Sequence, residues 1–298
     1  MRVVTLLPAA TEIVAALGGV SRLVGISHEC DYPESIVGLP RVTATPIDPT
    51  LPSARIDANV RRLSASGTPV IGIDADALRR LAPDLLITQS LCEVCAVADG
   101  EAYRLASALE RPPQVLRLGG TTLDGVWRDI RTVGKALGLG GKADALIAGL
   151  ERRLAALRRR APGMLPRVLC VEWLDPLFLA GHWTPELVAA AGGHDPAAAP
   201  GSHSARREWR EVAELRPDLI LVMLCGFGVE RSLAELDAIG PEGAAALALA
   251  PVWVLDGNAY TSRPGPRLVE GAERIAAALR GEELPGLVRW HDAVSLRR

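Results

Sequence analysis

The chain has 298 residues and a formal net charge of −2, with 49% hydrophobic and 23% charged residues. This length allows two domains of ordinary size or one large α/β domain, and the composition is that of a globular protein. The near-neutral charge supplies no field that would gather nucleic acid, and no stretch approaches the roughly 20 apolar residues that cross a bilayer. We therefore expect neither a nucleic-acid partner nor an integral membrane segment.

The N-terminal residues and the cysteines indicate the cellular compartment of the protein. Residues 1–8 lead directly into an apolar strand pattern, without the basic, apolar and small-residue order of a signal peptide. Five cysteines cannot all pair, and Cys170 and Cys225 stand in apolar runs that are typical of buried strands. Both observations favour a cytoplasmic, reducing location. A leader missing from this sequence would instead place the protein in the periplasm or outside the cell.

Short apolar runs alternate with helical patterns along the chain, which is typical of parallel βαβ units. We expect strands over residues 3–7, 23–27, 70–73, 85–88 and 115–118, and then over 168–172, 219–224 and 252–255. A similar sequence motif, in which a proline ends a helix and a buried strand follows, occurs in each half, at 81–87 and 215–221. The sequence therefore predicts two α/β lobes that are built alike.

A long helical segment separates the two halves. Residues 121–160 carry apolar side chains at helical spacing, with an interruption at the glycines of 138–141. No flexible linker rich in Ser, Gly and Pro is present, so the connection should be stiff. We predict an N-terminal lobe at 1–120, a connecting helix at 121–160 and a C-terminal lobe at 161–298.

The loops after the predicted strands hold the candidate ligand-binding residues, because open parallel sheets bind ligands beyond the carboxyl ends of their strands. Only 4% of the chain is aromatic, yet Tyr32, Trp173, Trp183 and Tyr260 fall in such loops, where they could clamp a flat ligand. The alternative is that such rings fill the core beneath the loops, and we expect this for Phe178.

Two polar residues follow the last predicted strand. Asp256 ends that strand, and Arg263 precedes a Pro-Gly-Pro turn. An arginine here could pair with a carboxylate, amide or phosphate of a ligand, or it could hold the loop in place. We predict polar ligand contacts from both residues.

Histidine and cysteine side chains in the same loops suggest metal chemistry. His28, Cys30, Cys92, Cys95 and His182 carry imidazole and thiolate groups, which suit zinc, copper or iron. We assign Cys30, Cys92 and Cys95 as the predicted metal ligands. Buried thiols without a metal are the alternative. We also predict His28 and His182 as ligand-binding residues, and either could supply an axial imidazole to a corrinoid cobalt or haem iron.

The sequence contains no recognisable catalytic set. It has no Walker lysine, no dinucleotide-binding glycine pattern and no Gly-x-Ser-x-Gly elbow. We therefore predict a binding protein and not an enzyme. An enzyme that uses the Cys-x-x-Cys pair of Cys92 and Cys95 on a bound cofactor stays open as the alternative from a different class.

Several motifs together resemble one family. They are the stretch Leu-Pro-Ala-Ala-Thr-Glu at 7–12, the two Pro-Asp-Leu junctions and the Arg-Pro-Gly-Pro-Arg run at 263–267. With them the chain resembles, over nearly its whole length, the periplasmic binding proteins that deliver cobalamin, haem and ferric siderophores to ABC importers. The Gly-His-Trp at 181–183 and the Asp-Gly-Asn-Ala-Tyr at 256–260 favour the cobalamin-binding branch.

This resemblance implies two Rossmann-like lobes with parallel sheets, joined by one long rigid helix, with the ligand cleft between the lobes. It implies corrinoid binding, most simply of cobalamin, by a monomer that needs no cofactor. A haem, ferric-siderophore or metal-ion receptor is the alternative. An ABC permease would dock on an acidic residue of each lobe. Asp76 can fill this role in the first lobe, whereas Arg210 stands at the matching position of the second, with Glu211 beside it. We therefore predict Asp76 and Glu211 as the docking residues.

Overall fold

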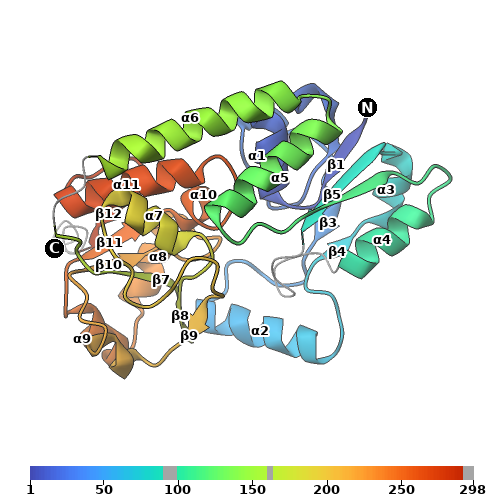
Figure 1. Cartoon of the computed structure of the whole chain (residues 1–298). Helices are drawn as coiled ribbons and strands as arrows, with labels where there is room; N and C mark the ends of the chain where they lie inside the picture. The colour runs from blue at the N-terminus through green and yellow to red at the C-terminus, as the bar shows by residue number, and fades with distance from the viewer. Residues whose placement is uncertain (90–98, 160–163, 291–298) are drawn as a thin grey trace. The chain divides into compact units, whose positions relative to one another are not determined.

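A computed structural model describes residues 1–89, 99–159 and 164–290 (Figure 1). The chain forms two compact units. Unit 1 comprises residues 1–51, 55–120 and 124–148, and unit 2 comprises residues 52–54, 121–123 and 149–298. The helices α2 (Ser53–Ala65) and α6 (Gly140–Arg158) each contribute residues to both units. The predicted domain boundaries differ from this division and stay a prediction.

Unit 1 is built around a parallel sheet, as predicted. Its strands β1 (Val3–Thr5), β2 (Leu23–Gly25), β5 (Leu85–Gln89) and β6 (Gln114–Leu118) lie in the order β2-β1-β5-β6. Val4 and Leu86 of the sheet pack against Leu78 of α3 (Ala75–Leu81) and Ala102 of α4 (Asp99–Ser107). Figure 1 shows α1 (Pro8–Ala16) and α5 (Leu123–Ala136) on the other side of this sheet.

One predicted strand of unit 1 does not join the parallel sheet. The segment predicted at 70–73 forms β4 (Gly72–Ile73), which pairs antiparallel with β3 (Thr43–Ala44) in a separate two-stranded sheet. Short 3-10 helices η1 (Val20–Arg22) and η2 (Glu34–Ile36) occupy the connections around β2. Apolar composition alone does not distinguish such a two-stranded ribbon from a buried parallel strand.

Unit 2 has a parallel core of three strands, as predicted, and short antiparallel strands extend it. The order is β12-β11-β10-β7-β8-β9. The strands β7 (Val168–Leu174), β10 (Leu219–Val222) and β11 (Val252–Leu255) are parallel. The additional strands β8 (Leu177–Leu179), β9 (Ala205–Arg206) and β12 (Leu287–Arg289) are short and pair antiparallel. These short strands carry little pattern in the sequence.

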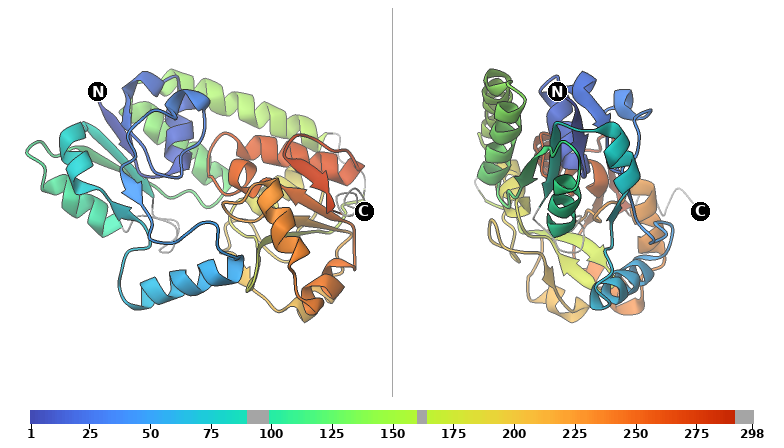
Figure 2. Two further views of the ribbon diagram at one scale, coloured as in Figure 1. Left: turned by 180° about the vertical axis from the view of Figure 1, so that it is seen from behind. Right: turned by 90° about the vertical axis from the view of Figure 1, so that its right-hand side faces the viewer.

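Helices cover both faces of the second sheet. The helices of unit 2 are α7 (Thr184–Ala191), η3 (Trp209–Ala213), α8 (Val229–Asp237), α9 (Pro241–Leu247), α10 (Gly257–Tyr260) and α11 (Leu268–Arg280). Figure 1 shows α7 and α11 together on one face. In Figure 2, seen from behind, α8 (orange) lies across the sheet from α11 (red).

The segment predicted as one connecting helix forms two helices. α5 ends at Ala136 and α6 begins at Gly140, so the break covers residues 137–139 and overlaps the interruption predicted at 138–141. Gly138 has a φ of +67°, a left-handed conformation that glycine adopts at little cost. The long helix that joins the units is therefore α6 alone. Among the described residues, no helix combines the length and the apolar character needed to span a bilayer.

Candidate ligand-binding site

An aromatic pair lies where β7 and β10 end. Trp173 is half-buried, and its ring centroid lies 5.3 Å from that of Phe227, which is buried. The indole N–H of Trp173 donates to the main-chain oxygen of Asp175 at 3.1 Å. The guanidinium of Arg231 lies 5.0 Å above the Phe227 ring. Trp173 is thus held on a rigid support at the edge where parallel sheets bind ligands.

The loop after β11 is tied to this pair. The backbone N–H of Asn258 donates to the Phe227 oxygen at 3.1 Å, and that of Gly226 donates to Ser262 Oγ at 3.2 Å. The Asn258 side-chain oxygen accepts from Arg263 at 2.8 Å. Arg263 is only 5% exposed, so it holds this loop from inside. The structure therefore brings the predicted residues Trp173 and Arg263 to one edge of unit 2.

Asp256 and Tyr260 have structural partners. Asp256 caps α10, because its side chain accepts from the backbone N–H of Ala259 at 2.8 Å. Tyr260 packs towards α11: the Arg274 guanidinium lies 3.7 Å from its ring centroid and donates to its hydroxyl at 2.8 Å. Contact of these two residues with a ligand stays a prediction.

His182 and Trp183 begin the approach to α7. Trp183 is 7% exposed, and its indole N–H donates to the Thr261 oxygen at 2.8 Å, so the ring is part of the unit 2 interior. His182 is half-buried in a left-handed conformation with φ of 55°, and its ring lies 5.4 Å from that of His203. Burial, together with His203, lowers the pKa of His182. Its imidazole is therefore neutral near neutral pH.

In unit 1 the loop after β2 carries three predicted residues. Tyr32 is 46% exposed. Cys30 is buried, and its Sγ lies 3.1 Å from Thr11 Oγ1. Arg41 fastens the loop from outside, because its Nη1 donates to the main-chain oxygens of Ser27 and Cys30.

His28 is held by a threonine. Thr43 Oγ1 accepts the backbone N–H of His28 at 3.0 Å and lies 2.7 Å from its Nδ1. Burial lowers the pKa of His28, the charge of Glu29 opposes this shift and that of Arg41 adds to it. His28 Nε2 is buried and has no hydrogen-bond partner.

The predicted metal ligands are described only in part. Cys92 and Cys95 lie outside the described residues, as does the rest of that loop. Within residues 1–89, 99–159 and 164–290, no three His, Cys, Asp or Glu side chains come together as a metal-binding group. Cys170 is buried as predicted, but Cys225 is exposed, because the chain leaves the sheet after Val222.

The predicted docking residues differ in their surroundings. Asp76 is 72% exposed in the first turn of α3 and pairs with Arg79. Glu211 accepts the backbone N–H of Glu208 at 2.6 Å in a capping box of η3, and it lies 3.7 Å from Arg207. Glu211 thus has a local structural role, and docking through either residue stays a prediction.

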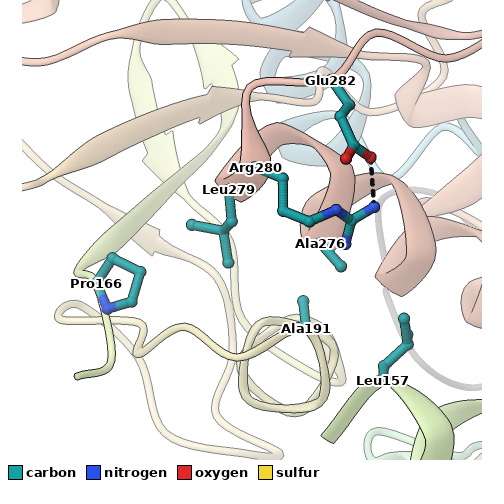
Figure 3. Close-up of a pocket in the computed structure, with 7 residues that line it drawn as sticks. All are labelled: Leu157, Pro166, Ala191, Ala276, Leu279, Arg280 and Glu282. Atoms are coloured by element: carbon teal, nitrogen blue, oxygen red, sulfur yellow. Dashed lines mark hydrogen bonds and ion pairs between the residues drawn. The ribbon is translucent and has the colours of Figure 1, made fainter. Parts of the chain in front are cut away.

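A cavity of about 550 Å³ lies elsewhere in unit 2 (Figure 3). Leu157 of α6, Ala191 of α7 and Leu279 of α11 line it, with Arg280 and Glu282 directed toward one another. Pro166, which precedes β7, also lines it. The cavity is therefore at the amino ends of the strands, opposite the edge that carries Trp173.

Some residues of the site carried no clear signal in the sequence. Phe227 stands in a short Gly-Phe-Gly segment, and only the scarcity of phenylalanine in this chain would have singled it out. The supporting hydroxyls of Thr43 and Thr11 belong to residues far from the loop that they hold. Their roles depend on tertiary contacts.

Comparison with known proteins agrees with this architecture. The family model described as periplasmic binding protein matches residues 3–253. The chain belongs to the periplasmic binding protein family. Its members are substrate-binding proteins of ABC transporters, normally periplasmic and not enzymes. A protein named cobalamin-binding protein from Halobacterium salinarum is 27% identical over 286 residues, which cover 93% of this chain and 69% of that protein.

Solved structures show the same two-lobed fold. A periplasmic haem-binding protein from Pseudomonas aeruginosa is 22% identical, with a TM-score of 0.72 and coverage of 97% of each chain. The periplasmic vitamin B12 binding protein of Vibrio cholerae is also 22% identical, with a TM-score of 0.65 and coverage of 94% of this chain and 96% of that one. At these identities the likeness establishes the fold.

Proposed function

We propose that this chain binds a corrinoid, with cobalamin as the leading ligand, as the substrate-binding component of an ABC importer or as a carrier. The observation that carries the proposal is the Trp173–Phe227 pair at the carboxyl edge of the unit 2 sheet. A half-exposed indole backed by a buried ring offers a flat apolar surface, and such surfaces bind macrocycles. The cobalamin-binding name of the relative from Halobacterium salinarum favours a corrinoid within this class.

Three other predicted residues have different roles in this proposal. Tyr32 offers a second exposed aromatic surface on unit 1. The buried Arg263 acts by holding the loop through Asn258. Placement of the ligand between the lobes stays a prediction. Docking on a permease through the exposed carboxylate of Asp76 is part of the same proposal.

Titration of purified protein with cyanocobalamin and hydroxocobalamin, followed by heat and visible spectra, tests this function. Saturable binding is the expected result. Trp173→Ala should weaken binding ~10-fold or more, since a ring contact is worth about 0.5–1.5 kcal/mol beyond the apolar area it buries. Trp173→Phe keeps an aromatic surface and should lose much less. Tyr103→Ala, which removes an exposed ring on α4, is the control and should bind normally.

Haem is the second candidate, and His182 favours it. Its half-buried ring has a lowered pKa, so it offers a neutral imidazole of the kind that ligates haem iron. A parallel titration of the protein with haem distinguishes the two candidate ligands. Haem would become the proposed ligand in place of cobalamin if the wild-type protein bound haem but no corrinoid, and if His182→Ala abolished the haem binding. Binding of neither macrocycle would reject the proposed class of ligand.

A further inference from the structure

We infer that Glu235 is a positioning residue for the aromatic surface at Trp173. It acts through Arg231, which pairs with it and lies over the ring of Phe227. Because the proposed function assigns macrocycle binding to this surface, the role of Glu235 rests on that function. Glu235 lies near the end of α8, and its effect on Trp173 follows from a series of contacts within unit 2.

The carboxylate of Glu235 is bound at both oxygens. Its Oε1 pairs at 2.8 Å with Nη2 of Arg231, which precedes it in α8, and its Oε2 accepts the backbone N–H of Ser53 at 3.0 Å. The Glu235 side chain is only 11% exposed. A carboxylate that two partners hold and that little solvent reaches keeps one orientation, so this pair is better ordered than the usual exposed pair on a helix surface.

Ser53 fixes Glu235 from outside α8. It is the first residue of α2, is 3% exposed and lies 182 residues from Glu235 along the chain. The first N–H groups of a helix have no partner within it, and the helix dipole favours a negative charge at this end. Residues 52–54 belong to unit 2, as α8 does, so this bond lies within one unit. Glu235 therefore has an anchor that does not depend on Arg231.

Arg231 transmits the effect of Glu235 to the aromatic pair. Its guanidinium lies 5.0 Å from the centroid of the Phe227 ring, and its side chain is 32% exposed. An arginine this accessible can adopt many rotamers, and ordering it costs conformational entropy. The ion pair with Glu235 offsets this cost and selects the rotamer in which the guanidinium covers the ring. Without Glu235, Arg231 would leave the Phe227 ring for part of the time.

The ring of Phe227 supports Trp173 directly. The two ring centroids lie 5.3 Å apart, with an angle of 47° between the ring planes. The Phe227 backbone is held separately, because its N–H donates to the Leu224 oxygen at 3.0 Å and its oxygen accepts the Asn258 N–H at 3.1 Å. Loss of the guanidinium would therefore leave this backbone in place and change the angle of the Phe227 ring. Trp173, which packs on that ring, would move with it.

Fluorine-19 NMR of the full chain labelled with 5-fluorotryptophan tests this positioning without any ligand. The Trp173 resonance is assigned by its loss in Trp173→Phe. Glu235→Ala should shift this resonance by more than its linewidth, and Glu235→Gln, which keeps the shape of the side chain, should shift it in the same direction if the alanine variant fails to fold. Glu230→Ala, at an exposed carboxylate in the first turn of α8, is the matched control and should leave it in place. An unmoved resonance in both Glu235 variants would overturn the inference.

Cyanocobalamin titration of the same variants tests whether the positioning matters for binding. Glu235→Ala should weaken binding about 2- to 5-fold, which is the effect expected for loss of one stacked cation. Arg231→Ala should have a similar effect, and the double variant should bind no more weakly than Arg231→Ala alone, because Glu235 acts through Arg231. Additive losses would show a different route and overturn the inference. Failure of the wild type to bind any corrinoid would instead reject the proposed function, and the fluorine resonance would still decide the positioning of Trp173.

Discussion

Asp84 and Asp218 make the same contacts in the two units. Asp84 Oδ2 accepts the backbone N–H of Arg2 at 2.7 Å, and Asp218 Oδ2 accepts that of Arg167 at 2.7 Å. The backbone N–H of each aspartate returns a bond of 2.8 Å to the oxygen of the same arginine. The repeated Pro-Asp-Leu phrase therefore aligns two neighbouring parallel strands at their amino ends, once in each unit.

Ala82 and Arg216, two residues before these aspartates, should tolerate glycine with a gain in stability. Both are exposed and have left-handed φ angles of 40° and 42°. A side chain there costs roughly 1–2 kcal/mol, which the greater chain entropy of glycine offsets only in part. Ala82→Gly and Arg216→Gly should each raise the free energy of unfolding by up to ~1 kcal/mol in urea titrations. Ala77→Gly, inside α3, should lower it by about 1 kcal/mol.

Asp195 should make stability fall as pH rises. It is 6% exposed, and burial raises its pKa to about 6, although the N–H groups of Ala197 and Ala198 oppose this shift. An unfolded aspartate titrates near pH 3.9, so between about pH 4 and 6 the folded state binds more protons. The carboxylate therefore costs ~3 kcal/mol above pH 6, and this cost disappears when the pH is lowered through that range.

Asp195→Asn removes this titration. Urea unfolding should show the variant to be more stable than the wild type by ~1–3 kcal/mol near neutral pH, with the difference vanishing near pH 4. Asp124→Asn, at an exposed carboxylate of α5, is the matched control and should leave the pH dependence nearly unchanged. A difference that stays constant with pH would contradict the raised pKa.

Gly257 should be essential for the loop that carries Asn258 and Arg263. A Cβ at this position would lie 2.2 Å from the Leu224 oxygen and 2.7 Å from the Met223 oxygen. Met223 and Leu224 directly follow β10, and their main-chain atoms cannot move away cheaply, so Gly257→Ala should displace α10. We expect a loss of ~2 kcal/mol or more in stability and a weaker affinity for the corrinoid.

Gly149→Ala is the control for this substitution. Gly149 lies in α6, and the nearest atom to its added Cβ would be 3.8 Å away, at the tip of Arg152. Alanine should therefore stabilise the helix by about 0.5–1 kcal/mol. Equal changes in the free energy of unfolding for the two glycine variants would contradict the close approach of the Leu224 and Met223 oxygens to Gly257.

Arg153 and Glu273 should couple weakly. They join α6 to α11 through two parallel hydrogen bonds of 2.8 and 2.7 Å, with side chains 43% and 33% exposed. Solvent screening limits such a pair to about 0.5–1 kcal/mol. A double-mutant cycle with Arg153→Ala and Glu273→Ala should give this coupling and should show that it shrinks at high salt. Coupling that salt does not change would indicate a desolvated pair.

The sequence predicted the strands with the strongest local signal. The run at 252–255 is β11 without change, and the two Pro-Asp junctions precede β5 and β10. Buried parallel strands must be continuously apolar, so composition reveals them. The short antiparallel strands β8, β9 and β12 were missed because their few residues gain their pairing from neighbours and not from a pattern of their own.

The candidate site, like the fold, could be predicted from the sequence only in part. Sequence alone determined the family resemblance, the α/β class and the edge of each sheet where ligands should be sought, because chain direction places these loops. Only the tertiary structure decided that Trp183 is buried while Trp173 stays half-exposed on Phe227. It also decided that Thr43 orients His28. Burial and hydrogen-bond partners depend on residues distant in the chain, and these determine which loop side chains can bind a ligand.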